Sequence, residues 1–279
     1  MEKVIIFGAG VQGRKILNEI RGEYEVVLLI DNNPKKNDTY IEGIRVLNLS
    51  KKVLDETEYD AIIIGTLSGY KAIMRQLMDY GVPSMKINTS WVELPTLARE
   101  KFVETLGVFL GDKGITGNVA EGGVFQGEFS AVMNKVFADR KLYLFDTFKG
   151  FDERDIDKEH NFSSAKQGDY AITSENMVMQ KMAYPENVII KKGYFPDSAN
   201  GIDDKFCFVN LDFDLYNPTS SGLEWFERKM VSGGVILVHD YFSTQFRGVK
   251  EAVDDYIRTR EHLKLIPIGD TISIAIVGF

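Results

Sequence analysis

"KLIPIG" (264–269) and "TISIAIVGF" (271–279) decide the fold of the second half of this 279-residue chain. Each segment is typical of a β-strand, because β-branched and other apolar residues dominate it and glycine ends the first. A parallel connection between two strands needs a dozen or more residues, and only Asp270 separates these two. The two segments must therefore form an antiparallel hairpin.

Five further strand candidates precede the hairpin, and helical stretches separate them: "NVAEGGV" (118–124), "KLYLFD" (141–146), "NVIIKK" (187–192), "KFCFVNLD" (205–212) and "GVILVHD" (234–240). Strands that alternate with helices predict a parallel sheet with right-handed crossovers. Five α/β units closed by an antiparallel hairpin resemble the class I methyltransferases. Residues 118–279 are therefore expected to form a domain of that α/β fold, with a seven-stranded sheet.

The first 90 residues predict a separate, smaller α/β domain. Its strand candidates are "KVIIFG" (3–8), "EVVLLID" (25–31), "DAIIIG" (60–65) and "SMKIN" (84–88). Apolar residues at helical spacing lie between the first two strands, and a second helix is expected over 68–80. We expect a Rossmann-like parallel sheet over 1–90, followed by a helical linker with a glycine-containing turn over 91–117.

Composition narrows the classes of partner. The net charge is −8, from 33 basic and 41 acidic side chains, so the chain as a whole has no electrostatic footprint for nucleic acid. Cys207 is the single cysteine, which excludes an intramolecular disulfide and favours a reducing compartment. No basic leader and no apolar run long enough for a membrane span stand out. We expect a cytoplasmic protein without a membrane span, and a homo-oligomer is compatible with the sequence.

"GAGVQG" (8–13) places three glycines between the first strand and its helix, with Asp31 at the tip of the next strand. Glycines at Gly8, Gly10 and Gly13 allow a tight turn whose backbone N–H groups approach a phosphate, and an acid at Asp31 can accept from a ribose hydroxyl. The pattern predicts a nucleotide site. The alternative is a turn that only packs the helix against the strand, with nothing bound.

A complete dinucleotide site is disfavoured here, because the segment of about 90 residues lacks a second mononucleotide-binding half. "LLIDNNPKKNDTYIEGIRVL" (28–47) instead resembles the small nucleotide-sugar-binding domain at the N-terminus of bacterial sugar acetyltransferases. The resemblance covers residues 3–88. It implies recognition of a nucleotide-linked sugar, with the three glycines and Asp31 as contacts.

"VAEGGVFQGEFSAVM" (119–133) is a second glycine-rich turn between a strand and a helix, and Asp146 closes the next strand. An acid before the turn and an acid at the next strand tip suit a cationic ligand that carries a ribose, such as S-adenosylmethionine. Two carboxylates would repel a phosphate. Glu121 is expected near the amino acid part of this ligand and Asp146 near the ribose hydroxyls, unless Glu121 only caps or pairs locally.

"VNLDFDLY" (209–216) ends an apolar strand on Asp212 and Asp214, and the strand candidate at 234–240 ends on Asp240. Carboxyl ends of strands in an open α/β sheet form the ligand crevice, so the three carboxylates should converge. Carboxylates this close raise one another's pKa unless a cation joins them, which predicts a hard divalent ion. The alternative is capping of the next helix by Asp214, or a salt bridge to Lys or Arg.

Together, "VAEGGVFQGEF", "LFDTFKGF", "VNLDFDLYNPT" and "GGVILVHDY" resemble the macrocin O-methyltransferase family over residues 105–279. The resemblance implies an S-adenosylmethionine-dependent O-methyltransferase that acts on a sugar hydroxyl with the help of a divalent metal, Mg²⁺ or else Mn²⁺. It implies that Asp212 and Asp240 bind the metal and that Asp214 is the general base. The cofactor-binding residues it implies are Glu121, Gly122, Gly123, Gly127, Asp146, Thr147, Phe148, Phe195 and Asp197.

His239 is a departure from the family pattern, which has two adjacent aspartates where this chain has His239–Asp240. As a metal ligand, histidine is softer than carboxylate, so the metal keeps an extra water or is an ion of the Mn or Fe type. His239 is equally compatible with a core or supporting role.

Two alternatives remain open at the level of function. The polar segment 152–175, with Phe162, Gly168 and Tyr170, is either a lid over the acceptor or a plain surface loop. The whole chain is expected to methylate a nucleotide-linked or glycoconjugate sugar, and the alternative is a catalytically inactive nucleotide-sugar-binding or tethering protein.

Overall fold

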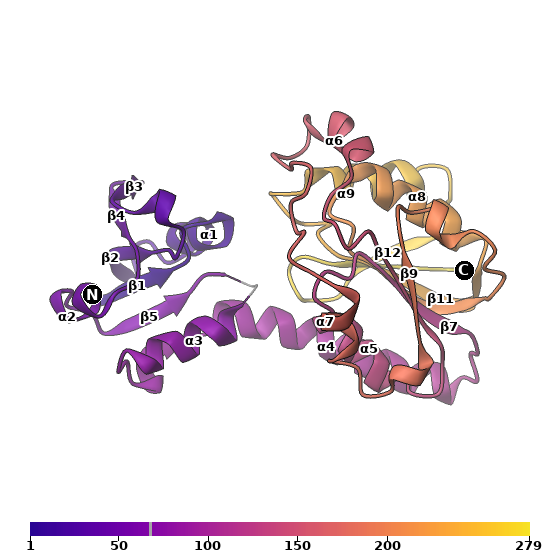
Figure 1. Cartoon of the computed structure of the whole chain (residues 1–279), viewed down its shortest axis with the longest axis horizontal. Helices are drawn as coiled ribbons and strands as arrows, with labels where there is room; N and C mark the ends of the chain where they lie inside the picture. Colours follow the sequence, from indigo (N-terminus) through magenta and orange to yellow (C-terminus); the bar gives the residue numbers. More distant parts are fainter. Residues whose placement is uncertain (67–68) are drawn as a thin grey trace. The chain divides into compact units, whose positions relative to one another are not determined.

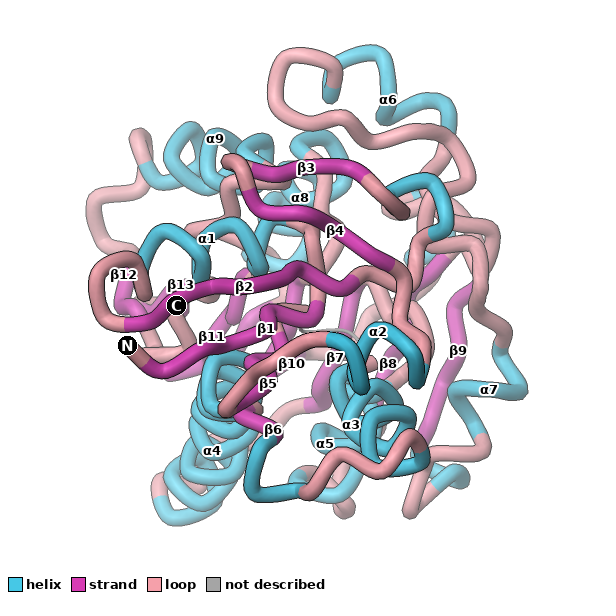
Figure 2. The backbone as a smooth tube through the Cα atoms, turned by 90° about the vertical axis from the view of Figure 1, so that its left-hand side faces the viewer, coloured by secondary structure: helices cyan, strands magenta, loops and turns pink. Residues whose placement is uncertain are grey.

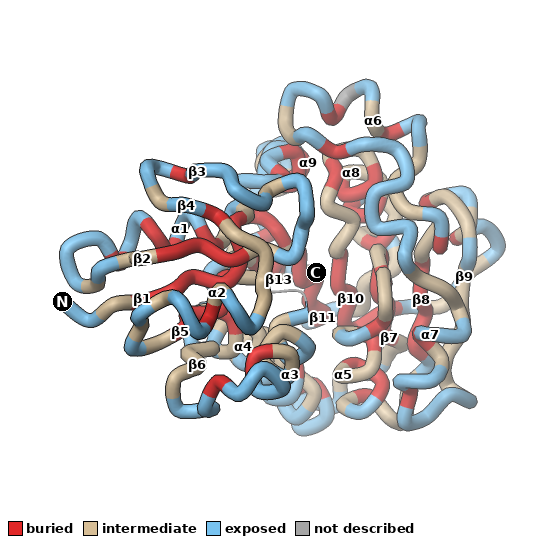
Figure 3. The backbone as a smooth tube through the Cα atoms, turned by 60° about the vertical axis from the view of Figure 1, so that its left-hand side comes forward, coloured by how far each residue is buried: buried red, intermediate tan, exposed pale blue. Residues whose placement is uncertain are grey.

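The computed structural model of the chain describes residues 1–66 and 69–279, which divide into two compact units, Met1–Leu97 and Ala98–Phe279. Each unit is built around a sheet of its own (Figure 1). In both sheets a central strand is buried along most of its length, as β1 of the first unit and β10 of the second show (Figure 3). The expected α/β class is confirmed.

The first unit holds a six-stranded sheet in the order β3-β4-β2-β1-β5-β6. Its strands are β1 (Glu2–Phe7), β2 (Tyr24–Ile30), β3 (Thr39–Ile41), β4 (Ile44–Leu47), β5 (Ala61–Ile64) and β6 (Ile87–Asn88). All pairs are parallel except β3 with β4. The helices are α1 (Val11–Glu19), α2 (Lys51–Glu56) and α3 (Tyr70–Asp79), with 3₁₀ turns η1 (Pro34–Lys36) and η2 (Ser84–Lys86).

Side-chain alternation along β1 explains the layers of this unit. Val4 and Ile6 pack with α1 on one face of the sheet, whereas Ile5 and Phe7 pack with α2 and α3 on the other. Successive strand residues point to opposite faces, so a strand apolar at every position is buried on both sides. The strand is thereby fixed in the middle of the unit, with its carboxyl end at the glycine turn.

The first unit differs from the prediction in three places. The helix expected over 68–80 is α3, with residue 68 outside the described residues. The strand expected over 84–88 is reduced to β6, because 3₁₀ turn η2 takes Ser84–Lys86. The antiparallel pair β3–β4, joined by Glu42 and Gly43 at φ 52° and 86°, was not expected.

The second unit holds a seven-stranded sheet in the order β12-β13-β11-β10-β7-β8-β9. Its strands are β7 (Asn118–Gly122), β8 (Leu142–Asp146), β9 (Val188–Lys192), β10 (Phe206–Leu211), β11 (Met230–Val238), β12 (Lys264–Pro267) and β13 (Ile274–Val277). The expected C-terminal hairpin is confirmed, since β13 pairs antiparallel with both β11 and β12. The other pairs are parallel.

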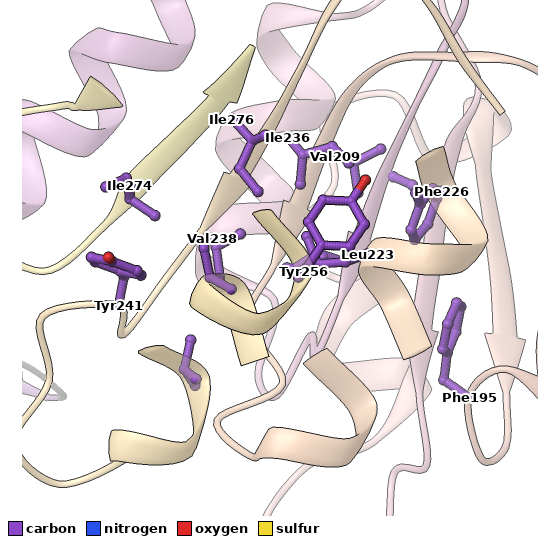
Figure 4. Packing of buried hydrophobic residues seen from close by; sticks show 14 of the residues in the cluster. Phe195, Val209, Leu223, Phe226, Ile236, Val238, Tyr241, Tyr256, Ile274 and Ile276 are labelled. Atoms are coloured by element: carbon purple, nitrogen blue, oxygen red, sulfur yellow. The ribbon is translucent and has the colours of Figure 1, made fainter. Parts of the chain in front are cut away.

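Helices cover both faces of this sheet. Figure 2 shows α8 (Tyr216–Glu227) and α9 (Arg247–Ile257) on one side, and α5 (Glu128–Val136) with the later part of α4 (Ser90–Asp112) on the other. On the first face, residues of β10, β11 and β13 meet Leu223, Phe226 and Tyr256 from the two helices (Figure 4). The aromatic and aliphatic side chains buried in this layer stabilise the unit through the hydrophobic effect.

The helical linker expected over 91–117 is largely the helix α4. Its residues Val103, Leu106 and Leu110 are buried in the core of the second unit. A helix with one apolar stripe packed on a sheet is part of the domain it covers. Residues from Ala98 onward therefore belong to the second unit rather than to a free connection.

The remaining elements of the second unit connect its strands. They are α6 (Glu153–Glu159), α7 (Glu175–Met179), η3 (Pro185–Asn187) and η4 (Asp197–Ala199). No helix in the described part of the chain has the length and apolar character to cross a membrane.

Candidate active site

The carboxyl ends of β7, β10 and β11 meet where the strand order reverses. Within the sheet, β8 and β9 lie on one side of β7, and the chain then crosses back so that β10 and β11 lie on the other side of β7. The Asp212 N–H donates to the carbonyl of Gly122 at 2.7 Å, and the His239 N–H donates to that of Leu211 at 2.9 Å. Ligands of open α/β sheets bind outside such a reversal.

Asp212, His239 and Asp240 converge at this edge. Nδ1 of His239 lies 3.0 Å from Oδ1 of Asp212 and 2.9 Å from Oδ2 of Asp240. One ligand atom from each of the three residues lies within 4.8 Å of the other two. Two carboxylates and an imidazole form a donor set that suits a divalent cation of the Mg, Mn or Fe type, so these residues fit the metal that the sequence predicts.

Two basic side chains, His239 and Arg99, offset part of the negative charge at this cluster. Burial and Arg99 lower the pKa of His239, but the carboxylates of Asp212 and Asp240 outweigh them and raise it to about 9. Burial alone would raise the pKa of Asp212, and His239 with Arg99 instead holds it well below its usual range. Without a metal, the imidazolium therefore carries the positive charge that the two carboxylates need.

Asp214 lies beside these carboxylates but not on a continuing strand. β10 ends at Leu211, and Asp214 has φ 63°, so the alternation of strand side chains is not what groups it with Asp212. Burial, followed by the negative charges of Asp240 and Asp212, raises the pKa of Asp214 well above its usual value. A carboxyl group with such neighbours holds a proton more strongly than an ordinary aspartate does.

Several non-glycine residues around the site have left-handed backbone conformations. They are Phe125, Phe148, Asp214 and Asp240, with φ between 49° and 63°. Asparagine and aspartate tolerate this region, but bulky aromatic residues rarely occupy it. Conformations of this kind cluster at functional sites, where the surrounding packing enforces them.

The glycine turn after β7 is braced by Asp146. Oδ2 of Asp146 accepts from the N–H groups of Val124 at 2.8 Å and Phe125 at 3.0 Å, and Oδ1 accepts from that of Phe148 at 2.6 Å. Thr147, next to it, donates through Oγ1 to the carbonyl of Gly150 at 2.7 Å. Asp146 thus joins the tip of β8 to the turn after β7.

Close backbone packing explains the glycines of this turn. A side chain at Gly123 (φ 80°) would collide with the carbonyl oxygen of Asp212, and one at Gly122 with the ring of Phe213. Gly127 (φ 83°) precedes α5 and lies against Val178. The turn therefore lies directly against the segment that carries the aspartates.

Glu121 is buried rather than exposed to the crevice. Ser130 donates to its Oε2, and Nδ2 of Asn210 donates to Oε1 at 2.9 Å. Burial raises the pKa of Glu121 to about 8, although both hydrogen bonds oppose the shift. The local pairing that the sequence left open is thus present, and the expected contact with an amino acid moiety stays a prediction.

Arg99 is a site residue that the sequence reasoning missed. Its Nη2 donates to Oδ1 of Asn210 at 2.9 Å and to Oδ2 of Asp212 at 3.1 Å, and its guanidinium lies 3.9 Å from the centre of the Phe129 ring. Arg99 belongs to α4, more than a hundred residues before the residues it contacts. No motif surrounds it, so only the packing of α4 on the sheet reveals the contact.

Phe195 and Asp197, which the resemblance places near the cofactor, contact other side chains of the second unit. Phe195 is buried in the core against Phe145 and Phe226 (Figure 4). The Asp197 side chain is 70% exposed, and Arg154 lies 3.4 Å from it. Their expected contacts with a cofactor remain predictions.

The segment 152–175 is tied to the second unit at several points. Glu159 is buried, and its Oε2 accepts from the N–H of Tyr216 at 2.9 Å. The ring of Tyr170 lies 5.4 Å from Phe125 and 5.2 Å from Phe151, measured between ring centres. Asp214, Asp240 and Asp212 contribute after burial to a raised pKa of Tyr170. This segment therefore extends over the glycine turn toward the carboxylates.

The first unit has a glycine turn of the same kind. A side chain at Gly13 would collide with the carbonyl oxygen of Gly8, whereas one at Gly10 would meet nothing within 4 Å. Oδ2 of Asp31 accepts from the Ala9 N–H at 2.9 Å and from Nζ of Lys36 at 2.8 Å. The acid at the tip of β2 is thus already paired within the unit.

The strand order of the second unit defines its class. A parallel sheet closed by an antiparallel C-terminal hairpin, with a glycine turn at the reversal, is the fold of class I methyltransferases. Two solved structures share the fold. The O-methyltransferase NovP aligns with a TM-score of 0.55 at 21% identity over 64% of this chain and 78% of its own. CalS11, described as a calicheamicin methyltransferase, aligns with a TM-score of 0.57 at 16% identity over 76% and 93%.

Residues 101–272 match the family Macrocin-O-methyltransferase (TylF), and the chain belongs to this family. Residues 1–88 match the family C2185-like, N-terminal. A curated relative from Streptomyces olivaceus, 8-demethyl-8-(2,3-dimethoxy-alpha-L-rhamnosyl)-tetracenomycin-C 4'-O-methyltransferase, is 26% identical over 157 residues. That alignment covers 51% of this chain and 59% of the length of the relative.

Proposed function

We propose that the chain is an S-adenosylmethionine-dependent O-methyltransferase that acts on a sugar hydroxyl with the help of a divalent cation. The observation that carries the proposal is that the glycine turn after β7 lies directly against the segment bearing Asp212 and Asp214. A methyl-donor site and a cluster able to bind a cation are thus neighbours in one unit. Membership in the TylF family and the sugar methyltransferase among its relatives support the same reading.

We assign the binding of the methyl donor to the glycine turn after β7 and to Asp146, which accepts hydrogen bonds from it. Gly122, Gly123 and Gly127 keep side chains out of the space beside the turn, and Thr147 and Phe148 follow Asp146 at the tip of β8. Asp146 carries the charge that suits a ligand with a sulfonium and a ribose diol. Glu121, whose pKa burial raises to about 8, lies in β7 directly before the turn.

The acceptor side is assigned to the carboxylate cluster. Asp212, His239 and Asp240 would hold the cation, which when bound polarises neighbouring sugar hydroxyls. Asp214, in its ionised form, takes the proton from the attacking hydroxyl, and its raised pKa makes that carboxylate a stronger base than an ordinary aspartate. The turn and the cluster hold the two reactants in line, which accounts for much of the acceleration in a two-substrate transfer.

Methyl transfer to a panel of UDP-, GDP- and dTDP-linked sugars, followed by mass spectrometry with and without EDTA, tests this function. We expect a product 14 Da heavier that EDTA abolishes and Mn²⁺ or Mg²⁺ restores. An inactive tethering protein would bind ligand and give no product with any metal. Calorimetry that found no binding of S-adenosylhomocysteine to the pure protein would overturn the proposal outright.

The first unit is assigned to the nucleotide part of the acceptor. Its support is the turn at Gly8, Gly10 and Gly13 with Asp31 at the next strand tip. Gly10→Val is the variant to test, because a Cβ atom there meets nothing within 4 Å and the fold should survive. We expect KM for a nucleotide-linked acceptor to rise while S-adenosylhomocysteine affinity is kept; unchanged acceptor kinetics would leave the first unit without this role.

A further inference from the structure

Arg99 is a partly buried cation to which the proposed reaction gives no role. Its side chain is only 12% exposed, and the Phe129 ring 3.9 Å away holds the guanidinium in place. Both hydrogen bonds come from one nitrogen, Nη2, which reaches Asn210 at 2.9 Å and Asp212 at 3.1 Å. A planar guanidinium on an aromatic face has little rotational freedom, so these two acceptors are held in a fixed relation.

The two oxygens of Asp212 have different partners as a result. Oδ2 faces Arg99, whereas Oδ1 lies 3.0 Å from Nδ1 of His239, on the side where the possible metal ligands converge. Asn210 is divided in the same way, because its Oδ1 accepts from Arg99 and its Nδ2 donates to Glu121 at 2.9 Å. Arg99 therefore orients the end of β10 as a whole.

Arg140 shows what a purely structural arginine looks like in the same unit. It is similarly buried, at 13% exposed, and lies over the ring of Phe137. Its guanidinium donates to two backbone carbonyls and a thiol, those of Gly117, Ile115 and Cys207. Arg99, by contrast, leaves its Nε buried without a hydrogen-bond partner among the described residues. An unpaired buried donor costs stability, so stability alone does not explain the placement of Arg99.

We propose that Arg99 is a positioning residue that holds one oxygen of Asp212 and thereby presents the other to the divalent cation of the proposed site. The inference rests on the proposed function, since it concerns the ligand set assigned there. A carboxylate that is free to rotate offers either oxygen or both to a metal, and an outer partner that fixes it selects one arrangement. The contact also explains why Asp212 needs a guanidinium on the side away from His239.

Binding of Mn²⁺ alone, measured by calorimetry and by the loss of the free-ion electron paramagnetic resonance signal, tests the inference. We expect Arg99→Met to weaken Mn²⁺ binding about tenfold or more. Arg99→Lys keeps the charge but loses the planar guanidinium that the Phe129 ring holds in place, so its Mn²⁺ affinity should lie between those of wild type and Arg99→Met. Arg140→Met is the matched control, which should lower Tm and leave Mn²⁺ affinity within about twofold.

An Arg99→Met variant that binds Mn²⁺ as tightly as wild type, or more tightly, would overturn the inference. If Arg99 acted only as a repelling charge, Arg99→Met would bind Mn²⁺ more tightly than wild type. Unchanged or tighter binding therefore removes Arg99 from this role and leaves the metal site standing. Wild type that binds no Mn²⁺ removes the metal site and the inference together. If Arg99→Met does not fold, folded Arg99→Lys with wild-type affinity decides against the role.

Discussion

Two glycine-rich turns, one in each unit, are braced in the same way and differ in their surroundings. In both, an aspartate at the tip of the next strand accepts backbone N–H groups of the turn: Asp31 from Ala9 at 2.9 Å, and Asp146 from Val124 at 2.8 Å. In the first unit Lys36 also pairs with Asp31, at 2.8 Å. In the second, the charge of Asp146 adds to those that raise the pKa of Asp214.

A glycine motif thus fixes backbone geometry but not the charge of the space beside it. Although burial opposes the shift, Lys36 and two backbone hydrogen bonds lower the pKa of Asp31. The negative charge of this carboxylate is therefore offset by Lys36 within the first unit. Asp146 instead belongs to a negative field shared with Asp212, Asp214 and Asp240. A negative field selects cationic ligands, whereas a neutralised turn remains open to an anionic one.

Asp214→Asn should have the largest effect, because it removes the proposed base from the negative field of the second turn. We expect kcat for methyl transfer to fall about 10²- to 10⁴-fold, with S-adenosylhomocysteine affinity nearly unchanged. Asp38→Asn is the matched control in the first unit, since Asp38 also has a left-handed backbone (φ 58°) and its side chain pairs with the exposed Arg45 at 2.8 Å. A kcat within threefold of wild type would remove Asp214 from catalysis.

Gly123→Ala against Gly10→Ala tests how differently the two turns are packed. At Gly123 (φ 80°) the added carbon meets the Asp212 carbonyl, so we expect a loss of about 3 kcal/mol or more in the free energy of unfolding. At Gly10 (φ −94°) it meets nothing within 4 Å, and the change should stay within about 0.5 kcal/mol. Urea unfolding measures both; equal losses would show that the turns are packed alike.

The pH dependence of Mn²⁺ binding tests the electrostatic half of the comparison. The pKa of His239 is raised to about 9, and its nitrogen binds a metal only after the proton leaves. Below that pH, each unit of increase should therefore tighten Mn²⁺ binding about tenfold, and above it the dependence should end. Calorimetry at pH 7, 7.5 and 8 measures the slope. His239→Asn should flatten it, and a flat wild-type profile would mean that His239 is not a ligand.

Lys36→Met should have the smallest effect. Lys36 is 35% exposed and Asp31 15%, and Asp31 keeps its backbone donors when the lysine is lost. We expect a loss of at most about 1 kcal/mol in the free energy of unfolding, which largely disappears in 1 M salt. Lys15→Met, which breaks the exposed pair with Glu19, is the control and should cost less. A loss that persists in high salt would mean that Lys36 matters through packing.

The fold of the second unit was predictable because the short connection between its last two strands allows only one way of pairing them. Only Asp270 separates the last two strand candidates, and that spacing leaves an antiparallel hairpin as the sole connection. The placement of Asp212 and Asp240 followed from the same logic, since strand ends in a parallel sheet share one edge. Two short strands were not predicted. "TYIEGIRVL" (39–47) contains a two-residue Glu42–Gly43 turn between β-branched residues, which is typical of a hairpin, and the strands β3 and β4 on either side of it were not expected.

The rest of the site depends on contacts that no local pattern encodes. Arg99 reaches Asp212 across more than a hundred residues because α4 packs on the sheet. Phe195, an aromatic residue beside a strand end, has the same sequence character whether it faces a ligand or the core, and it lies in the core. Burial of Glu121 likewise depends on Ser130 and Asn210 arriving from other elements.

The left-handed conformations of Phe125 and Phe148 have a consequence for engineering. Glycine or asparagine at these positions would relieve a conformation that aromatic residues rarely adopt. Selection for heat resistance alone is therefore expected to replace them, and the ring of Phe125 that meets Tyr170 would be lost with the substitution. Heat-resistant descendants of this chain should then turn over more slowly, the usual exchange between rigidity and rate.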